Sequence, residues 1–131
     1  MRAQTRDGIA RYACPVDLTL DVIGRKWQPL ILWHLSTGPL NYNVLQAALP
    51  KVSHKVLTQQ LRDLERHGVI SRTVTGAGRR VSYALTEFGT TLRPVLRTMA
   101  EWGKRHHEEM GAEIALTRPI RERRLALMSA G

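Results

Sequence analysis

The chain has 131 residues, which suits one domain with a single core, and 43% of them are hydrophobic against 24% charged. This composition excludes the disordered and fibrous classes. Twenty Lys and Arg against eleven Asp and Glu leave a formal charge of +9, which favours a polyanionic partner such as nucleic acid or an anionic membrane surface. We expect one domain over residues 1–131, with an N-terminal arm of about residues 1–14 and a C-terminal extension of about residues 111–131.

Two classes of protein are excluded by what the sequence lacks. It has no apolar run near the roughly 20 residues that cross a bilayer, and its start, MRAQTRDGIARYACP, has no apolar core like that of a signal peptide. We therefore expect a cytoplasmic protein without a membrane partner. The single cysteine, Cys14, excludes an intrachain disulfide and a multi-cysteine zinc site, so any covalent role for it must involve another molecule.

Three short helices are predicted in the first part of the chain. CPVDLTLDVIG places apolar residues ahead of Gly24, which predicts a helix that ends at this glycine. KWQPLILWHL, followed by the stop signal TGP, predicts a buried second helix. Its apolar stripe consists of Trp27, Leu30, Ile31 and Leu35. NYNVLQAALP predicts a short third helix with Asn41 as its N-cap.

The stretch SHKVLTQQLRDLERHGVI predicts a fourth, strongly amphipathic helix that Ser53 caps and Gly68 ends. One side carries leucines at helical spacing and should be buried: Leu57, Leu61 and Leu64. The opposite side is polar and should project outward. It consists of Ser53, His54, Lys55, Thr58, Gln59 and Arg62.

A hairpin is predicted next, because VISRTVT and VSYAL are rich in β-branched and aromatic residues and the glycine-containing link GAGRR suits a turn. The tip of this hairpin carries Arg79 and Arg80. Arginines there suit contact with phosphates and with narrow A·T minor grooves.

A long helix is predicted from Thr86 onward, with a bend at Pro94. Its apolar stripe includes Phe88 and either Val95 or Leu96. A long helix after a small body has little of its own core to cover, which favours a second copy of the chain as the cover over a core role. The expected dimer contacts are Leu92, Val95, Met99 and Trp102.

Signals are mixed in the last twenty or so residues. TRPIRERR is charged and interrupted by proline, whereas four apolar residues support a last helix. These are Ile114, Leu116, Leu125 and Leu127. We expect part helix and part frayed tail.

This order of elements predicts a mainly α fold with a small β-hairpin, arranged as a winged helix-turn-helix with a long C-terminal dimerisation helix. The fourth helix would be the recognition helix, whose Gln, Arg and Lys reach base edges while Ser and Thr reach phosphates or bases. Residues 51–80 contain seven Lys or Arg and two Asp or Glu, so positive charge concentrates in the expected contact region. Asp63 and Glu65 should face away from phosphates, with Arg66 paired to them.

Three stretches together resemble the HxlR-type winged helix-turn-helix transcriptional regulators of the MarR-like superfamily. They are CPVDLTLDVIGRKWQPLILWHL, GPLNYNVLQAALPKVSHKVLTQQLRDLERHGVISRTV and VSYALTEFGTTLRPVLRTMAEWG, within which the cysteine-proline start, GRKW and LTQQLRDLE are specific in combination. The resemblance implies a dimeric regulator of double-stranded DNA, more often a repressor, with no catalytic activity and no cofactor. It also implies a recognition helix over residues 53–66, a wing around residues 76–80, and dimerisation through the N-terminal segment and the long helix.

Cys14 has two interpretations. With Pro15 in the first helical position, the thiol lies at a helix N-terminus, where Arg11 and Arg25 add positive charge and Asp17 opposes it. Regulators that resemble this chain often use such a cysteine to sense oxidants or electrophiles such as quinones and aldehydes. The alternative is a structural cysteine packed under the N-terminal arm.

Other functions and signals stay open at this stage. His106 and His107 are expected to be surface residues rather than metal ligands, because adjacent side chains point about 100° apart on a helix. A small cysteine enzyme would pair Cys14 with one of the five histidines, and an RNA-binding module would need more aromatic residues than one Phe and three Tyr. Instead of Cys14, the signal of a regulator could be a small ligand between the N-terminal arm and the long helix.

Overall fold

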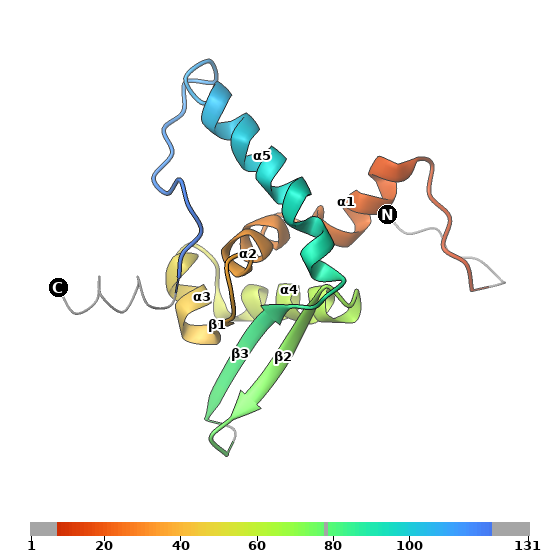
Figure 1. The fold of residues 1–131 in the computed structure, drawn as a ribbon, viewed down its shortest axis with the longest axis vertical. Helices are drawn as coiled ribbons and strands as arrows, with labels where there is room; N and C mark the ends of the chain where they lie inside the picture. Colours follow the sequence, from red (N-terminus) through yellow and green to blue (C-terminus); the bar gives the residue numbers. More distant parts are fainter. Residues whose placement is uncertain (1–7, 78, 122–131) are drawn as a thin grey trace.

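The computed structural model describes residues 8–77 and 79–121, so the expected helix residues Leu125 and Leu127 lie outside the described part. Its elements in chain order are α1 (Pro15–Ile23), α2 (Gln28–Leu35), β1 (Leu40–Asn41), α3 (Tyr42–Ala48), α4 (His54–Arg66), β2 (Ile70–Thr75), β3 (Arg80–Leu85), a 3-10 helix η1 (Gly89–Leu92) and α5 (Arg93–His106). Figure 1 shows the hairpin of β2 and β3 projecting from one end of the molecule and α5 from the other. This is the predicted mainly α, winged helix-turn-helix fold.

The helix ends agree with the expected capping residues. Asn41 Oδ1 accepts a hydrogen bond from the Val44 N–H at 2.9 Å, and Ser53 Oγ accepts one from the Val56 N–H at 3.2 Å. Gly68 has a φ of +75°, a conformation that glycine adopts without strain, and it lies just beyond the end of α4. The cap at Ser53 and the glycine at position 68 therefore set the two boundaries of α4.

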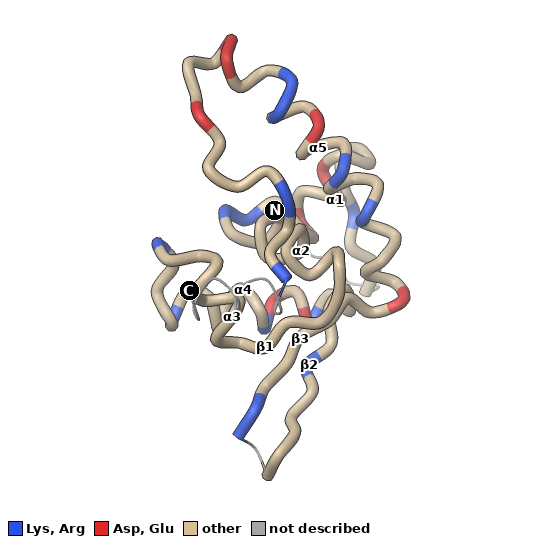
Figure 2. The backbone as a smooth tube through the Cα atoms, turned by 60° about the vertical axis from the view of Figure 1, so that its left-hand side comes forward, with Lys and Arg blue, Asp and Glu red and all other residues tan. Residues whose placement is uncertain are grey.

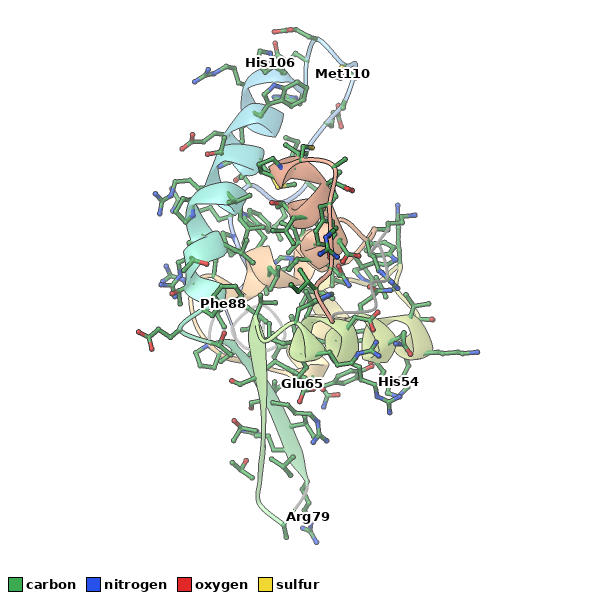
Figure 3. All side chains as sticks on the ribbon, turned by 90° about the vertical axis from the view of Figure 1, so that its right-hand side faces the viewer. His54, Glu65, Arg79, Phe88, His106 and Met110 are labelled. Atoms are coloured by element: carbon green, nitrogen blue, oxygen red, sulfur yellow. The ribbon has the colours of Figure 1, made fainter. Side chains whose placement is uncertain are left out.

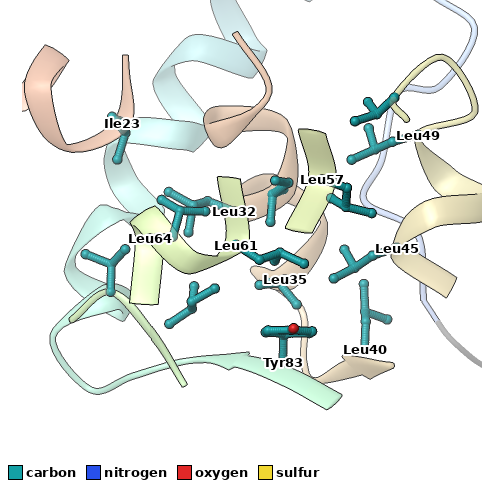
Figure 4. Packing of buried hydrophobic residues seen from close by; sticks show 14 of the residues in the cluster. Ile23, Leu32, Leu35, Leu40, Leu45, Leu49, Leu57, Leu61, Leu64 and Tyr83 are labelled. Carbon is teal, nitrogen blue, oxygen red and sulfur yellow. The ribbon is translucent and has the colours of Figure 1, made fainter. Parts of the chain in front are cut away.

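One hydrophobic cluster joins the helices to the sheet, and Leu57, Leu61 and Leu64 of α4 lie inside it as predicted (Figure 4). The buried face of α2 differs from the predicted stripe. Leu30 is 39% exposed, whereas Leu32 is fully buried. Because α2 is apolar on nearly every side, its pattern does not fix which side faces the core.

The sheet contains one strand more than the predicted hairpin. Its strand order is β1-β3-β2, and β1 pairs antiparallel with β3 through Leu40 opposite Tyr83. A strand of two residues is too short to produce an alternating pattern, so the sequence did not predict it. Arg79 lies in the turn, while Arg80 is already the first residue of β3, opposite Thr75.

The predicted long helix begins later than Thr86. Thr86 Oγ1 donates to the Gly68 carbonyl at 2.6 Å and accepts from the Gly89 N–H at 2.9 Å, which holds a turn between β3 and η1. Phe88 lies in this turn and is 63% exposed. Pro94 is in the first turn of α5, so the predicted bend at Pro94 is wrong: the proline starts the helix.

After α5 the chain reverses at Gly111, whose φ is +64°, and returns along α5 to α2 as an irregular segment (Figure 1). Ile114 and Leu116 therefore do not form the helix that they were expected to support. Ile120 is 5% exposed, and its N–H donates to Nδ1 of the buried His34 at 2.9 Å. Across residues 8–77 and 79–121, no helix has the length and apolar character needed to span a membrane.

Candidate nucleic-acid interface

The polar face of α4 is presented outward because its leucines are held in the core. Ser53, His54, Lys55, Gln59 and Arg62 are exposed, and Thr58 is half-buried. Ser53 Oγ already accepts the capping hydrogen bond, so its hydroxyl has a structural task at the start of the helix. The predicted recognition surface is thus accessible along the length of α4.

A polar groove of about 840 Å³ lies between α3, the outward face of α4 and the hairpin. It brings together five of the predicted DNA-binding residues, which are His54, Thr58, Arg62, Arg79 and Arg80. Ser53, Lys55 and Gln59 do not line it, although Gln59 and Arg62 border the next hollow along α4. Figure 3 shows His54 and Glu65 on the side of α4 that faces the hairpin, with Arg79 at its tip.

The groove also contains residues that the sequence analysis did not select. Asn43 belongs to α3, and Arg72 extends from β2 opposite Tyr83. An arginine in a predicted strand next to the hairpin tip was the available signal for Arg72. Its inclusion makes four arginines around one groove, with Glu65 as the acidic residue among its lining.

His54 is held at the start of α4 by α3. The Tyr42 hydroxyl and His54 Nδ1 form a hydrogen bond of 2.5 Å, and the two rings meet edge to face with 5.2 Å between their centres. This contact orients the imidazole at the mouth of the groove. It also ties the first turn of α4 to α3.

Asp63 is a buried hydrogen-bond acceptor on α4. Its side chain is 6% exposed, and its carboxylate accepts hydrogen bonds from Gln59 Nε2 at 3.2 Å, from Arg25 Nη1 at 3.3 Å and from Arg66. Asp63 is therefore buried beside Gln59 at the edge of the polar face, and it is paired with Arg66 as expected. Arg25 precedes α2, so this carboxylate links the segment between α1 and α2 to α4.

Glu65, which was expected to face away from phosphates, lies on the groove side of α4. It is exposed and lines the groove together with Arg62. The reason is helical spacing, because residues three apart share one face of a helix. A carboxylate at this position lowers the positive potential near Arg62 and favours a base amino group over a phosphate as its neighbour.

Basic residues lie at the tip of the wing, whereas several acidic residues lie on α5 and just after it. Figure 2 shows Lys and Arg at the tip end of β3, and several of the Asp and Glu residues along α5 and the segment that follows it. The wing and α4 thus form the more positive end of the described molecule, which suits a polyanionic partner.

Cys14 is exposed and is the N-cap residue of α1, with Pro15 in the first turn. Asp17 Oδ2 accepts a hydrogen bond from the Ala13 N–H at 3.0 Å, so an acidic group does lie beside the cap. Arg25 lies beyond the far end of α1 and pairs with Asp63, which makes the expected contribution of Arg25 to the cysteine's surroundings wrong. The exposure of Cys14 among the described residues does not fit a packed structural cysteine.

The stripe on α5 divides into an inward and an outward part. Leu96 is 3% exposed and belongs to the core, while Leu92 is half-buried against it. Val95, Met99 and Trp102 are 38%, 50% and 60% exposed. A second apolar set is exposed on α1, namely Val16, Leu18 and Leu20.

The histidines at the end of α5 have partners within the chain. His106 Nδ1 lies 3.1 Å from Glu109 Oε1, and His107 Nδ1 lies 2.8 Å from the Ala112 carbonyl oxygen. Within the ranges that the structure describes, no group of three or more His, Cys, Asp or Glu side chains could hold a metal ion.

Comparison with known proteins places these features in a family context. Residues 22–110 match the model of the HxlR-like helix-turn-helix family. The uncharacterized HTH-type transcriptional regulator YdeP of Bacillus subtilis is 45% identical over 98 residues, which cover 74% of this chain and 77% of YdeP. A second such regulator of that organism, YybR, is 41% identical over 99 residues, covering 75% of this chain and 79% of YybR.

Solved structures of other regulators are also similar to this chain. The redox regulator HypR in its reduced form is 38% identical with a TM-score of 0.71, and the match covers 75% of this chain and 98% of HypR. The oxidized form of HypR is 42% identical with a TM-score of 0.67, covering 70% and 96%. Quinone-bound YodB from B. subtilis is 31% identical with a TM-score of 0.61, covering 70% and 98%.

Proposed function

Because the chain belongs to the HxlR-like helix-turn-helix family of DNA-binding transcriptional regulators, we propose that it is a homodimeric repressor of a pseudo-palindromic operator. The observation that carries this proposal is the groove in which the polar face of α4 meets the arginines of the wing. Two recognition helices of a dimer enter successive major grooves about one helical turn apart, and each wing follows the adjacent backbone. The rival enzyme and RNA-binding functions have no comparable observation in their favour.

The chemistry and position of each side chain indicate which part of the DNA it contacts. Lys55, Thr58 and Gln59 lie in the first half of α4 and supply contacts to base edges or phosphates, with Ser53 and His54 at the helix start. Arg62, one turn further on, contacts phosphate. The wing residues Arg79 and Arg80 contact the backbone or the minor groove.

The second copy is proposed to cover the exposed apolar residues of α1 and α5. Val95, Met99 and Trp102 form a stripe on α5 that the described chain leaves open to solvent, next to the half-buried Leu92. Large exposed apolar side chains at regular spacing are characteristic of a surface that another protein covers. A symmetric dimer buries the same stripe twice.

Replacing Gln59 with Ala is expected to lower discrimination between the operator and a single-base variant by about 1–3 kcal/mol. Asp63 holds the Gln59 amide at 3.2 Å, which limits its rotation and orients it for readout. Competition binding against operators with one substituted base pair measures this effect. Gln46→Ala on α3, outside the groove lining, is the matched control. Equal weakening on all sequences would show that Gln59 does not read a base.

Cys14 is proposed as the site of oxidant or electrophile sensing. It is exposed at the N-cap of α1, one of the two helices proposed to form the dimer, so a change at its sulfur acts on the contact that sets the spacing of the two recognition helices. The structural relatives support this role, because HypR is named as a redox regulator and YodB has been solved with bound quinone. Control by a small ligand is the alternative signal.

Treatment with 1,4-benzoquinone or diamide is expected to weaken operator binding of the parent protein by about 5- to 150-fold, the usual range of coupling between two sites. The Cys14→Ser protein should keep its affinity under the same treatment. Gel-shift titration measures both proteins. Intact mass checks that the parent carries one quinone adduct per chain or, after diamide, a disulfide that joins the Cys14 residues of two chains. If the serine variant loses affinity just as the parent does, Cys14 is not the sensor.

A further inference from the structure

The hydrogen bond between Tyr42 and His54 connects the two helices of the helix-turn-helix, and both residues line the polar groove. Tyr42 is the first residue of α3, and His54 is the first residue of α4. Figure 3 shows His54 at the opposite end of α4 from Glu65. The imidazole at the start of α4 is therefore held by a neighbouring helix as well as by its own backbone.

Two contacts fix the orientation of the His54 ring. Its Nδ1 lies 2.5 Å from the Tyr42 hydroxyl oxygen, and the two rings meet edge to face, with 5.2 Å between their centres and 74° between their planes. Tyr42 is half-buried, whereas His54 is exposed, so the tyrosine is the anchored partner of the pair. An exposed side chain that is held in this way loses less conformational freedom when it binds a partner. The imidazole is thus preorganised before DNA arrives.

The contact with Tyr42 also determines which nitrogen of His54 carries the outward proton. A phenol O–H is a better donor than its oxygen is an acceptor, because the aromatic ring withdraws electron density from that oxygen. The Tyr42 hydroxyl therefore donates to Nδ1, and the proton of the neutral imidazole is on Nε2. A protonated imidazole carries a proton on Nε2 as well. His54 consequently presents an N–H donor at Nε2 in either charge state.

We propose that Tyr42 is a positioning residue for DNA binding, which directs the Nε2–H of His54 to a backbone phosphate at the mouth of the groove. This inference rests on the proposed DNA-binding function. In a helix-turn-helix the first helix crosses the DNA backbone while the second enters the major groove, and His54 is tied to that first helix. A donor held there fixes the register of the protein on the duplex without reading its sequence.

The surroundings of His54 favour a phosphate over a base as the acceptor. Residues five apart on a helix are rotated by about 140°, so His54 and Gln59 point in different directions from α4. Gln59, the proposed base reader, does not line the groove, whereas His54 lines it together with Arg79 and Arg80. Because these arginines are the proposed contacts to the backbone, His54 belongs with the residues that position the protein.

A double-mutant cycle on an operator duplex and on a duplex of unrelated sequence tests the role of Tyr42. His54→Ala should weaken binding to both duplexes about tenfold, and Tyr42→Phe, which removes only the hydroxyl, about threefold. In the His54→Ala background Tyr42→Phe should have no further effect, because the hydroxyl acts through His54. Gln46→Ala on α3, outside the groove lining, is the matched control and should bind as the parent does.

The ring nitrogens of His54 give a second readout that needs no DNA. In protein with ¹⁵N-labelled histidine at about pH 8, where a free imidazole is neutral, the parent should show Nδ1 as the unprotonated nitrogen of His54. Tyr42→Phe should move the Nδ1 signal towards the average of the two tautomers. The signals of His106 and His107, at the end of α5, should stay in place. The His54→Ala spectrum assigns the signals.

Three results would overturn the inference. The first is a parent protein in which His54 carries its proton on Nδ1. The second is a Tyr42→Phe protein that binds DNA as the parent does, or that loses as much affinity in the His54→Ala background as in the parent. The third is a loss on the operator alone, which would make a base edge the acceptor. A parent that binds neither duplex would contradict the DNA-binding function and this contact with it, whereas these three results contradict the contact alone.

Discussion

Replacing both wing arginines together, Arg79→Ala with Arg80→Ala, should weaken operator binding about 100-fold, on the order of 3 kcal/mol, with nearly the same loss on every DNA sequence. Both residues are exposed, line the groove beside α4 and stand at or next to the turn of the hairpin. Contacts to phosphate position a protein on DNA without reading its sequence, which is why the loss should be uniform. The fold should be unaffected, because neither side chain packs in the core.

The salt dependence of binding gives this prediction its sharpest measurement. Each neutralised phosphate contributes about −0.9 to the slope of log affinity against log salt concentration, so losing four contacts in a dimer should flatten the slope by about 3 to 4. Fluorescence anisotropy at several salt concentrations measures it, with Arg105→Ala plus Arg121→Ala as a control of equal charge. A change near 2 would mean that only two of the four arginines contact phosphate, which the single variants Arg79→Ala and Arg80→Ala would then assign. An unchanged slope would contradict phosphate contact by the wing.

The free energy of unfolding is expected to fall by about 3 kcal/mol between pH 7 and pH 4 because of His34 alone. This residue is 3% exposed, and burial lowers its pKa from 6.5 to about 4. Below pH 6.5 the unfolded chain therefore binds a proton that the folded chain does not. The contribution of His34 to stability is complete above pH 6.5, declines as the pH falls towards 4, and changes no further below that value.

Chemical denaturation at a series of pH values, comparing the parent with His34→Gln, isolates this contribution from that of the carboxylates. Glutamine retains an acceptor for the Ile120 N–H but does not titrate, so the variant should lose less stability than the parent between pH 6.5 and 4.5. His106→Gln, at the distant end of α5, controls for the loss of a histidine as such. Parallel pH profiles for the parent and His34→Gln would contradict the assignment.

The first prediction concerns exposed charge on the wing, and the second concerns a buried histidine in the core. The wing acts on a partner through exposed charge, which salt weakens. His34 acts within the fold, where protonation would remove the acceptor of the Ile120 N–H and so release residue 120 from α2.

Much of the candidate DNA interface was predictable because its signals are local. In α4 the cap at Ser53, the leucines at helical spacing and the stop at Gly68 act within a few residues of one another, and each appears in the structure as predicted. The polar side chains between the leucines then point outward by helical geometry alone. Pairing of the two strands that carry the wing followed equally from their composition and the glycine-containing link.

Features that depend on contacts between distant residues were not predictable. Asp63 and Arg25 are 38 positions apart, and nothing in their local sequence indicates the ion pair that joins the segment between α1 and α2 to α4. The two residues of β1 become a strand only because β3 lies beside them. The sequence did not indicate which face of α2 is buried, because apolar residues lie on nearly every side of the helix. Packing against the rest of the protein determines that face.

The order of elements and the outward face of α4 follow from the sequence, because capping, periodicity and local charge are encoded over short distances; the family followed from the resemblance of whole stretches of the chain to other regulators. The path of residues 111–121 back along α5, the hydrogen bond from the Ile120 N–H to His34 and the apolar hollow beside α5 depend on tertiary contacts and were not predictable. Burial of these side chains depends on surfaces that helices far apart in the chain create together. Packing between residues far apart in the chain therefore places part of the C-terminal segment against α2 and α5.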